Sequence, residues 1–284
     1  MIENISDAFA IIEGSPTGNP YDFGSTMHYN NMAFSKNKKS TIETIDKNYQ
    51  HTIGYRLKLS FLDTKALNHR YCDHICDDNT WIPPDCRNKG YPNPNKCTEC
   101  LCPQGYATPY CDQVEKGQMQ GEGFGIIGKL INSKIQNINF MSKWKIRHFD
   151  ILTKQRESPL YSECPGESNI LLTSDYPEME EVRWYNASKF TCYWRIQAPA
   201  DYYIGVELKN IEGFKCEQSC YSFVEIKYGN MENSGPRFCC DLPTETLYTE
   251  VQGHEVIIIT HGYKPGNHSL TLKKQLIILD NQLF

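Results

Sequence analysis

Apolar and polar residues alternate along the C-terminal half of the chain in the way that half-buried β-strands require. Residues 192–198 alternate in this manner, and residues 204–208 and 223–228 repeat the pattern. Residues 255–260 instead form a continuous apolar run, which is typical of a strand in the core of a sandwich. Short strands separated by turn signals predict two packed antiparallel sheets.

The first seventy residues are polar and rich in turn signals, and they carry one helix signal. Ser60 and Asp63 stand three positions apart, which is the spacing of a capping box. We therefore predict a helix that begins after Ser60 and ends near Arg70. Its apolar residues, which are expected to share one face, are Phe61, Leu62, Leu67 and Tyr71.

Cysteines are numerous and clustered. The chain has 284 residues and 13 cysteines, seven between Cys72 and Cys111 and six between Cys164 and Cys240. Clusters of this density read as disulfide frameworks, which persist in oxidising compartments, so we expect a secreted, extracellular protein. Because 13 is odd, at least one cysteine lacks a partner within the chain.

Composition excludes several classes. A hydrophobic content of 39% excludes a disordered chain, and a net charge of −5 gives no reason to expect nucleic acid as a partner. No run of about 18 apolar residues is present, so no membrane span is expected. Residues 1–7 carry neither the basic region nor the apolar core of a signal peptide. The expectation is therefore a chain whose true N-terminus is missing, or one that is never exported.

Residues 20–29, with the sequence PYDFGSTMHY, resemble the Met-turn of the astacin family of zinc metalloendopeptidases. The family pattern S-x-M-H-Y is matched at each fixed position. Residues 33–36, 52–54 and 59–61 are also similar to that family, as are Arg56 and Asp63. The resemblance covers about the last third of such a catalytic domain. It implies that residues 1–72 are the C-terminal portion of a metzincin α+β peptidase domain.

The resemblance also implies roles for two residues of the Met-turn (Ser25–Tyr29). Met27 would form a hydrophobic floor beneath a zinc ion held by three histidines. Tyr29 would ligate zinc and then swing away to hydrogen-bond the transition-state oxyanion, a charge that a phenol stabilises only as it develops. In such enzymes a zinc-bound water attacks the peptide carbonyl. His28 is interpreted as structural.

The zinc-binding sequence of the family, H-E-x-x-H-x-x-G-x-x-H, does not occur among the eight histidines of this chain. His254–Glu255 is followed by Ile258 where the second histidine would stand. We therefore expect zinc in the complete parent enzyme, but no metal bound by this chain and no hydrolysis by it alone. Without the rest of the domain, residues 1–72 should pack poorly. The family partner of Cys72 lies in the missing half, so Cys72 should be unpaired.

Residues 73–112 are rich in proline, and Cys100–Tyr106 resembles the close of an EGF-like module. Spacing alone leaves 15 connectivities open for six cysteines. A zinc site at Cys97-x-x-Cys100 is a competing interpretation. The pairing that the family resemblance implies is Cys76–Cys97, Cys86–Cys100 and Cys102–Cys111.

Residues 164–275 resemble a CUB module, an all-β sandwich, through residues 192–196, 198–199, 223–226 and 235–239. Many CUB modules bind calcium through an aspartate where this chain has Ser222, so calcium is not expected. The disulfides implied are Cys164–Cys192, and Cys216 and Cys220 with Cys239 and Cys240 in an order left open.

Two segments match no module. Residues 113–163 are predicted to be a linker or the product of a faulty gene model, and residues 276–284 a tail. Glycosylation triplets occur at Asn4, Asn186 and Asn267.

The order of catalytic domain, EGF-like module and CUB module is that of nematode-type astacins. The leading hypothesis is a secreted zinc metalloendopeptidase that cleaves extracellular or cuticular proteins in its complete form, with this chain inactive alone. The alternative is a non-catalytic EGF–CUB binding protein with extracellular protein ligands. No phosphate loop and no Ser/His/Asp grouping supports an enzyme acting on small molecules.

Overall fold

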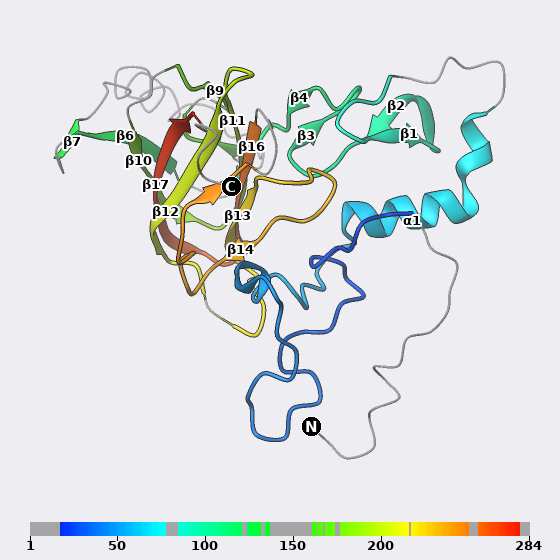
Figure 1. Cartoon of the computed structure of the whole chain (residues 1–284), viewed down its shortest axis with the longest axis horizontal. Coiled ribbons are helices and arrows are strands. Elements are labelled where there is room, and N and C mark those ends of the chain that lie inside the picture. The colour runs from blue at the N-terminus through cyan, green and yellow to red at the C-terminus, as the bar shows by residue number, and fades with distance from the viewer. Residues whose placement is uncertain are drawn as a thin grey trace, which may run out of the picture.

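A computed structural model shows the architecture of the chain (Figure 1). Within the described residues, no helix is long and apolar enough to cross a membrane. The predictions made for Asn4, Cys216 and His254 concern positions outside the described residues. The structure describes residues 18–77, 85–120, 124–131, 134–136, 161–162, 164–166, 168–173, 177–215, 217–249 and 255–278.

Two sheets pack face to face and form a β-sandwich. One sheet has the strand order β15-β12-β17-β10-β6-β7 and is antiparallel throughout. The other has the order β14-β13-β16-β11-β5-β8, and β9 pairs with β11 in parallel. The first sheet comprises β6 (Phe124–Ile131), β7 (Lys134–Gln136), β10 (Glu178–Ala187), β12 (Tyr203–Glu212), β15 (Leu247–Tyr248) and β17 (Gly266–Ile277). The second comprises β5 (Gln118–Gln120), β8 (Tyr161–Ser162), β9 (Asn169–Leu171), β11 (Lys189–Gln197), β13 (Phe223–Lys227), β14 (Arg237–Phe238) and β16 (Glu255–Gly262).

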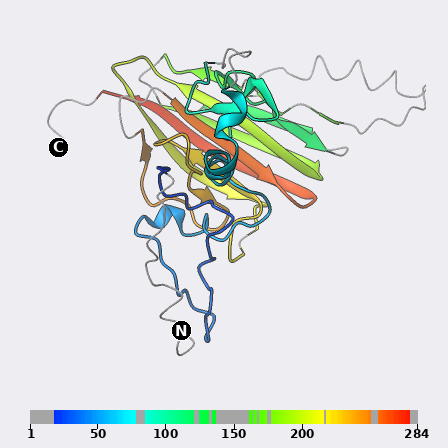
Figure 2. The same ribbon diagram turned by 90° about the vertical axis from the view of Figure 1, so that its right-hand side faces the viewer.

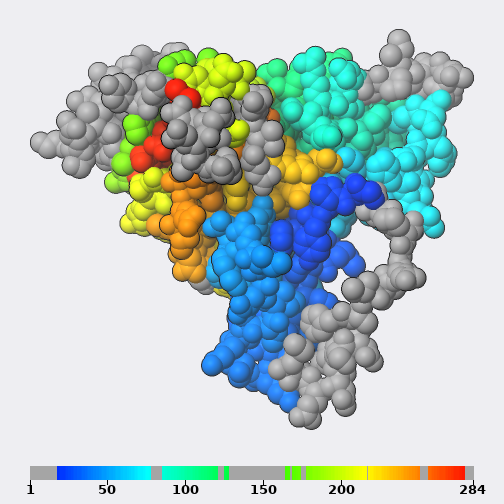
Figure 3. Space-filling view, in the orientation of Figure 1, coloured from blue at the N-terminus to red at the C-terminus, as the bar shows by residue number. Residues whose placement is uncertain are grey.

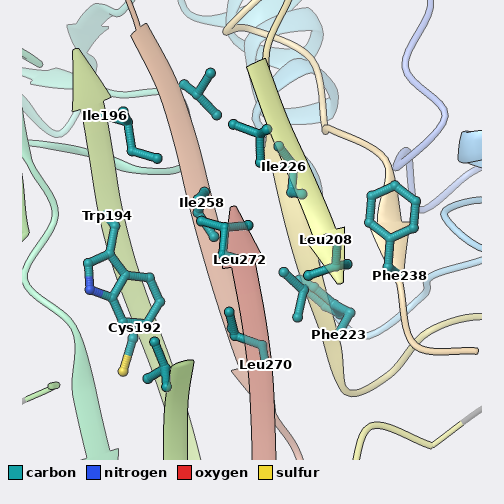
Figure 4. Packing of buried hydrophobic residues seen from close by; sticks show 14 of the residues in the cluster. Cys192, Trp194, Ile196, Leu208, Phe223, Ile226, Phe238, Ile258, Leu270 and Leu272 are labelled. Atoms are coloured by element: carbon teal, nitrogen blue, oxygen red, sulfur yellow. The ribbon is translucent and has the colours of Figure 1, made fainter. Parts of the chain in front are cut away.

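Apolar side chains from both inner faces fill the sandwich (Figure 4). Trp184 is fully buried and stacks on Phe190, with ring centroids 4.8 Å apart. The four alternating or continuous segments of the sequence form β11, β12, β13 and β16, so the strand predictions are confirmed. Two packed sheets follow because each strand buries its apolar positions against the opposite sheet.

The second sheet is buried on its outer face as well. On β16, Val256 and Ile258 enter the sandwich core, whereas Ile257 and Ile259 pack with Tyr106 and other residues of the disulfide-rich part of the chain. This double burial explains why residues 255–260 show no polar alternation.

The disulfide-rich module (residues 73–115) lies against that outer face. It contains η3 (Asp73–Cys76) and two small antiparallel pairs, β1 (Tyr91–Asn93) with β2 (Lys96–Leu101) and β3 (Tyr106–Ala107) with β4 (Gln113–Val114). Cys97 and Cys100 are in disulfides, so the zinc interpretation of that pair is wrong, because a zinc site needs free thiolates. The bonds are Cys76–Cys97, Cys86–Cys100 and Cys102–Cys111, which are the pairs that the EGF-like resemblance implies.

The N-terminal segment (residues 18–72) runs below the disulfide-rich module and along the sandwich (Figures 1 and 2). It contains η2 (Lys47–Tyr49) and α1 (Phe61–Tyr71). A reciprocal capping box between Ser60 and Asp63 starts α1, so the helix prediction is confirmed. Its apolar face is only partly used, because Leu62 is buried whereas Leu67 and Tyr71 are exposed.

The interpretation of residues 113–163 as a linker or gene-model artefact is wrong for the part that the structure describes. Residues 118–120 and 124–131 form strands of the two sheets, and residues 113–114 pair with β3. Gly117, just before β5, has no side chain and so adds nothing to an apolar pattern that would indicate a strand. A side chain there would collide with the Cys164 sulfur and approach the Thr191 carbonyl oxygen within 2.8 Å, so the close approach requires glycine.

The predicted limits of the β-domain, 164–275, change accordingly. The sandwich begins at β5 and ends with β17, where Leu276 is still buried. The predicted tail at 276–284 therefore begins too early.

Replacing Met119 by alanine tests this correction. Met119 is fully buried in the sandwich core, so Met119→Ala is expected to reduce the free energy of unfolding by about 2–5 kcal/mol. Urea denaturation of the disulfide-intact chain measures the change. The neighbouring Gln118 is exposed, and Gln118→Ala should shift stability by no more than about 0.5 kcal/mol. Equal small effects from both variants would contradict the placement of this strand.

Candidate functional site

The Met-turn follows a tight turn that Asp22 organises. The Ser25 backbone N–H donates to the Asp22 carbonyl oxygen (3.2 Å), and the Gly24 N–H donates to the Asp22 carboxylate (3.0 Å). The His28 N–H then donates to the Ser25 carbonyl oxygen (3.1 Å). Two successive turns therefore fix the backbone that carries Met27 and Tyr29.

Asp63 ties the Met-turn to the start of α1. Its carboxylate accepts hydrogen bonds from the Ser25 hydroxyl (2.6 Å) and the Thr26 N–H (2.9 Å), and also from the Ser60 N–H (3.0 Å). Burial by itself would raise the pKa of Asp63, but the bonds from Ser25, Ser60 and Thr26 outweigh it and lower the pKa. One carboxylate thus caps the helix and holds the turn in place.

The side chains of the Met-turn point in different directions. Met27 is 79% exposed, and Tyr29 is 43% exposed. The Tyr29 ring packs against Phe34 and lies 5.6 Å from the guanidinium of Arg56. The His28 imidazole hydrogen-bonds the Tyr29 carbonyl oxygen (2.6 Å), in agreement with a structural interpretation of this histidine. The Tyr29 phenol is therefore accessible to a ligand.

The residues present do not form a zinc site. In the described part of the chain, no three His, Cys, Asp or Glu side chains are grouped to hold a metal ion. Met27 is exposed and does not lie beneath any group of metal-binding side chains among these residues. The His28 imidazole hydrogen-bonds the backbone carbonyl oxygen of Tyr29. No catalytic step is therefore assigned to zinc on this chain.

Residues 51–55 dock the N-terminal segment onto the sandwich. The Cys220 N–H donates to the His51 carbonyl oxygen (3.0 Å), and the Ser219 hydroxyl donates to the Ile53 carbonyl oxygen (2.6 Å). Ile53 is fully buried. The expectation that residues 1–72 pack poorly is therefore wrong for this stretch, because the outer face of the sandwich supplies the missing packing surface.

A buried arginine is at the centre of this contact. The Arg237 Nε donates to the Glu225 carboxylate (2.8 Å), and both side chains are almost completely buried. The guanidinium carbon lies 4.3 Å from the ring centre of Tyr55 and 4.6 Å from that of Phe223. We call these four residues the arginine clasp. Such a pair is costly to break, since either partner alone would remain as an unpaired buried charge.

A loop of the sandwich also holds the turn before the Met-turn. The Ser234 N–H donates to the Asp22 carboxylate (3.2 Å), and the Asn233 amide donates to the Tyr21 carbonyl oxygen (2.8 Å). Lys65 of α1 forms a salt bridge of 2.6 Å with Glu232. Figure 3 shows the N-terminal segment, in blue, against the sandwich.

Sequence reasoning did not find the arginine clasp. Glu225 lies in a strand that reads as half-buried, and Arg237 lies in a short loop-like stretch almost two hundred residues from Tyr55. Nothing local to either residue signals a buried ion pair. The apolar pattern around Phe223 predicts a strand, but it does not predict that Arg237 and Tyr55 pack on the outer face of that strand.

The structure places the remaining predicted site residues apart from the Met-turn. Cys72 is a free thiol, and Ser222 is buried and accepts a hydrogen bond from the Tyr263 N–H. Two further disulfides among the described cysteines hold the sandwich. Asn186 and Asn267 are both exposed, and the Asn186 N–H donates to the Asn267 side chain (3.0 Å). Those disulfides are Cys164–Cys192 and Cys220–Cys239.

Comparisons with known proteins connect this geometry to a protease family. Residues 6–72 match the family model described as Astacin, a peptidase family. The chain is 33% identical to zinc metalloproteinase nas-37 of Caenorhabditis elegans over 249 residues, which cover 86% of this chain and 25% of that protein. It is 35% identical to zinc metalloproteinase nas-36 of the same organism over 243 residues, which cover 85% of this chain and 32% of that protein.

Residues 6–72 therefore match the astacin family, and the chain as a whole is similar to nematode zinc metalloproteinases. It spans about a quarter to a third of the length of these curated relatives. Among solved structures, the CUB1-EGF-CUB2 domain of human MASP-1/3 matches 31% of this chain and 33% of that chain at 23% identity. The TM-score of 0.26 is too low for a conclusion about the fold.

Asp63→Asn should loosen the Met-turn in a pH-dependent way. The folded-state pKa of Asp63 is lowered, so its contribution is present above the unfolded pKa and is lost as pH falls through the folded value. At neutral pH the variant should lose about 1–2 kcal/mol of local stability. Hydrogen exchange of the Thr26 amide measures it.

The wild-type advantage should shrink as pH is lowered below about 4. Asp46→Asn is the matched control, because Asp46 caps the exposed η2 and has no described contact with the turn. Equal effects of both variants on Thr26 would contradict the role of Asp63.

Gly54→Ala should release the N-terminal segment from the sandwich. Gly54 has φ of +83°, and an added methyl group would collide with Asn30 and lie 2.7 Å from the Ser219 hydroxyl oxygen. Backbone strain and overpacking together should cost about 2–4 kcal/mol. The measurement is limited proteolysis of residues 51–60 together with urea denaturation.

Gly18→Ala separates the two effects. Gly18 also has a positive φ (+72°), but an added methyl group there meets no atom within 4 Å. This variant should show the backbone strain of about 1 kcal/mol without increased proteolysis of residues 51–60. Similar proteolysis of both variants would show that Gly54 does not control docking.

Proposed function

We propose that this chain is the Met-turn-bearing part of a secreted astacin-type zinc metalloendopeptidase, joined to an EGF-like module and a CUB module. The observation that carries the proposal is the Met-turn itself. It lies within the matched residues 6–72, Asp63 fixes its backbone, and it presents an accessible Tyr29 phenol. The relatives named zinc metalloproteinases align over both the N-terminal segment and the β-rich remainder.

In this proposal Tyr29 donates a hydrogen bond to the carbonyl oxygen of the scissile peptide as negative charge develops on it. Asp63 acts as a positioning residue, because its carboxylate binds Ser25 and Thr26 of the Met-turn, whereas the arginine clasp fixes residues 52–55 on the sandwich. The zinc ligands and the general base come from a sequence that these 284 residues do not contain. The chain by itself is therefore inactive, and zinc belongs to a protein that carries both parts.

The disulfide-rich module and the sandwich would serve extracellular protein substrates or ligands. Five disulfides among the described cysteines support an oxidising compartment. Asn186 and Asn267 are proposed glycosylation sites, because both side chains are exposed. Ser222 leaves the CUB-type calcium position without a carboxylate, so we propose that calcium is not bound there.

A second function is a binding protein without catalysis. The observation in its favour is the docking of residues 51–55, which gives the chain a folded body that includes the Met-turn. Its partners would be extracellular proteins that contact the two modules.

Activity measurements separate these proposals. The purified, disulfide-bonded chain should show no zinc binding in equilibrium dialysis and no cleavage of a fluorogenic protein substrate. In a product that also carries the zinc-binding sequence, cleavage should be sensitive to chelators. There Tyr29→Phe should lower kcat by about 10²–10³ with little change in KM.

Tyr21→Phe is the control, since Tyr21 contacts the sandwich through its backbone and is also exposed. It should leave kcat unchanged. Chelator-sensitive cleavage by the 284-residue chain would overturn its proposed inactivity. An inactive longer product would favour the binding protein.

A further inference from the structure

A cavity of about 230 Å³ lies where the N-terminal segment, the disulfide-rich module and the sandwich meet. Tyr55, Phe61 and Leu101 contribute apolar surface to its wall, and Arg237 and Lys58 contribute positive charge. One water occupies roughly 30 Å³ in the liquid, so the volume suits a small organic molecule. Each of the three parts of the chain supplies some of the wall, so the cavity exists only in the assembled fold.

Arg237 lines this cavity and carries a buried side-chain donor for which the described residues supply no acceptor. The residue is 3% exposed, and its Nε is bound to Glu225. Its Nη1 is buried and has no hydrogen-bond partner among the described residues. A guanidinium has five N–H donors in a planar fork, which matches the geometry of a carboxylate. A buried donor left unpaired is costly, which favours a ligand that accepts from it.

The beginning of α1 also lines the cavity, and the Asp63 carboxylate, which accepts from the Ser60 N–H, already faces the positive end of this helix. Ser60, Phe61 and Thr64 line the cavity, and they are the N-cap and part of the first turn of an eleven-residue helix. The N-terminus of a helix carries a partial positive charge. Lys58 lies just before the helix, is exposed, and has no ion-pair partner within 4 Å among the described residues. An anionic group would therefore meet two cationic side chains, Arg237 and Lys58.

Glu115 is the acidic residue in the wall, and the structure limits its effect. Burial raises the pKa of its carboxyl, the nearby Lys58 opposes that shift in part, and Tyr193 is its hydrogen-bond partner. The carboxyl group is thus already engaged by a phenol. Its raised pKa makes it a weaker competitor for Arg237 than an exposed glutamate would be.

We propose that this cavity binds a carboxylate attached to an aromatic or branched apolar body. The carboxylate accepts from Arg237 and approaches Lys58, and the apolar body packs against Tyr55, Phe61 and Leu101. A free small acid and the C-terminal residue of a peptide share this chemistry. The site includes neither Met27 nor Tyr29 and does not depend on the proposed protease function.

Calorimetry on the full disulfide-bonded chain at pH 7 tests the proposal with phenylacetate. Phenylacetamide is the matched neutral probe, and acetyl-glycyl-phenylalanine presents the same chemistry on a peptide. Phenylacetate should bind with one-to-one stoichiometry and at least tenfold more tightly than the amide. Binding of both acids would assign the site to peptide C-termini as well as free acids. Binding of phenylacetate alone would assign it to free acids.

Lys58→Met should weaken phenylacetate binding about fivefold, because Lys58 is a partly solvated cation. Lys39→Met is the control, since Lys39 is exposed and does not line the cavity. It should leave the affinity unchanged. Equal affinities for acid and amide, no binding of either acid, or an unchanged affinity in Lys58→Met would overturn the proposal.

Arg237 is examined without substitution, because its loss would leave Glu225 unpaired and could prevent folding. The side-chain N–H resonances of Arg237 in ¹⁵N-labelled protein should shift when phenylacetate is added and stay in place with phenylacetamide. Phenylacetate that binds without moving these resonances would show that the acid occupies another site.

Discussion

The second sheet of the sandwich is buried on both faces, and the rest of the molecule is arranged by that constraint. Phe223, Glu225 and Lys227 project from the outer face of β13, beside Ile257 and Ile259 of β16. An apolar outer face in water would be unfavourable by roughly 25 cal/mol for each Å² left exposed. The disulfide-rich module covers one part of this face, and residues 51–55 cover another.

The charged residues on that face determine where each neighbour docks. Lys227 is buried and donates to the carbonyl oxygens of Gln104 and Met231, and its burial lowers its pKa to about 8. Glu225 is bound to Arg237, which in turn contacts Tyr55. Buried polar groups accept only partners that satisfy them, so these contacts fix position more narrowly than apolar packing does.

This arrangement connects the Met-turn to the modules that follow it in the chain. Asp63 holds the backbone of the Met-turn, and the sandwich loop at Asn233 and Ser234 holds the turn that precedes it. In the proposed protease, Tyr29 would need such a rigid support, because a displacement of about 1 Å can lower the rate of an enzyme by two orders of magnitude. The sandwich is then part of the scaffold of the Met-turn as well as a separate interaction module.

The helix and the sandwich strands were predictable from local signals. A capping box at Ser60 and Asp63 and the alternation in residues 192–198 act within a few residues, where spacing alone sets the geometry. The Met-turn is equally readable, because its pattern is contiguous. Strands β5 and β6 were not predictable, because glycines required for close approach, such as Gly117 before β5 and Gly125 within β6, weaken the apolar pattern of the segment.

The sequence by itself thus determined helix α1, strands β11, β12, β13 and β16, the disulfide-rich character and the relation to a protease family. Only the tertiary structure decided that Asp63 holds Ser25 and Thr26, that Arg237 and Glu225 pair beneath Tyr55, and that a cavity opens among the three parts. The physical reason is the distance along the chain over which each interaction acts. Capping and strand alternation depend on neighbours in the chain, whereas a buried charge depends on whichever distant residues desolvate and satisfy it.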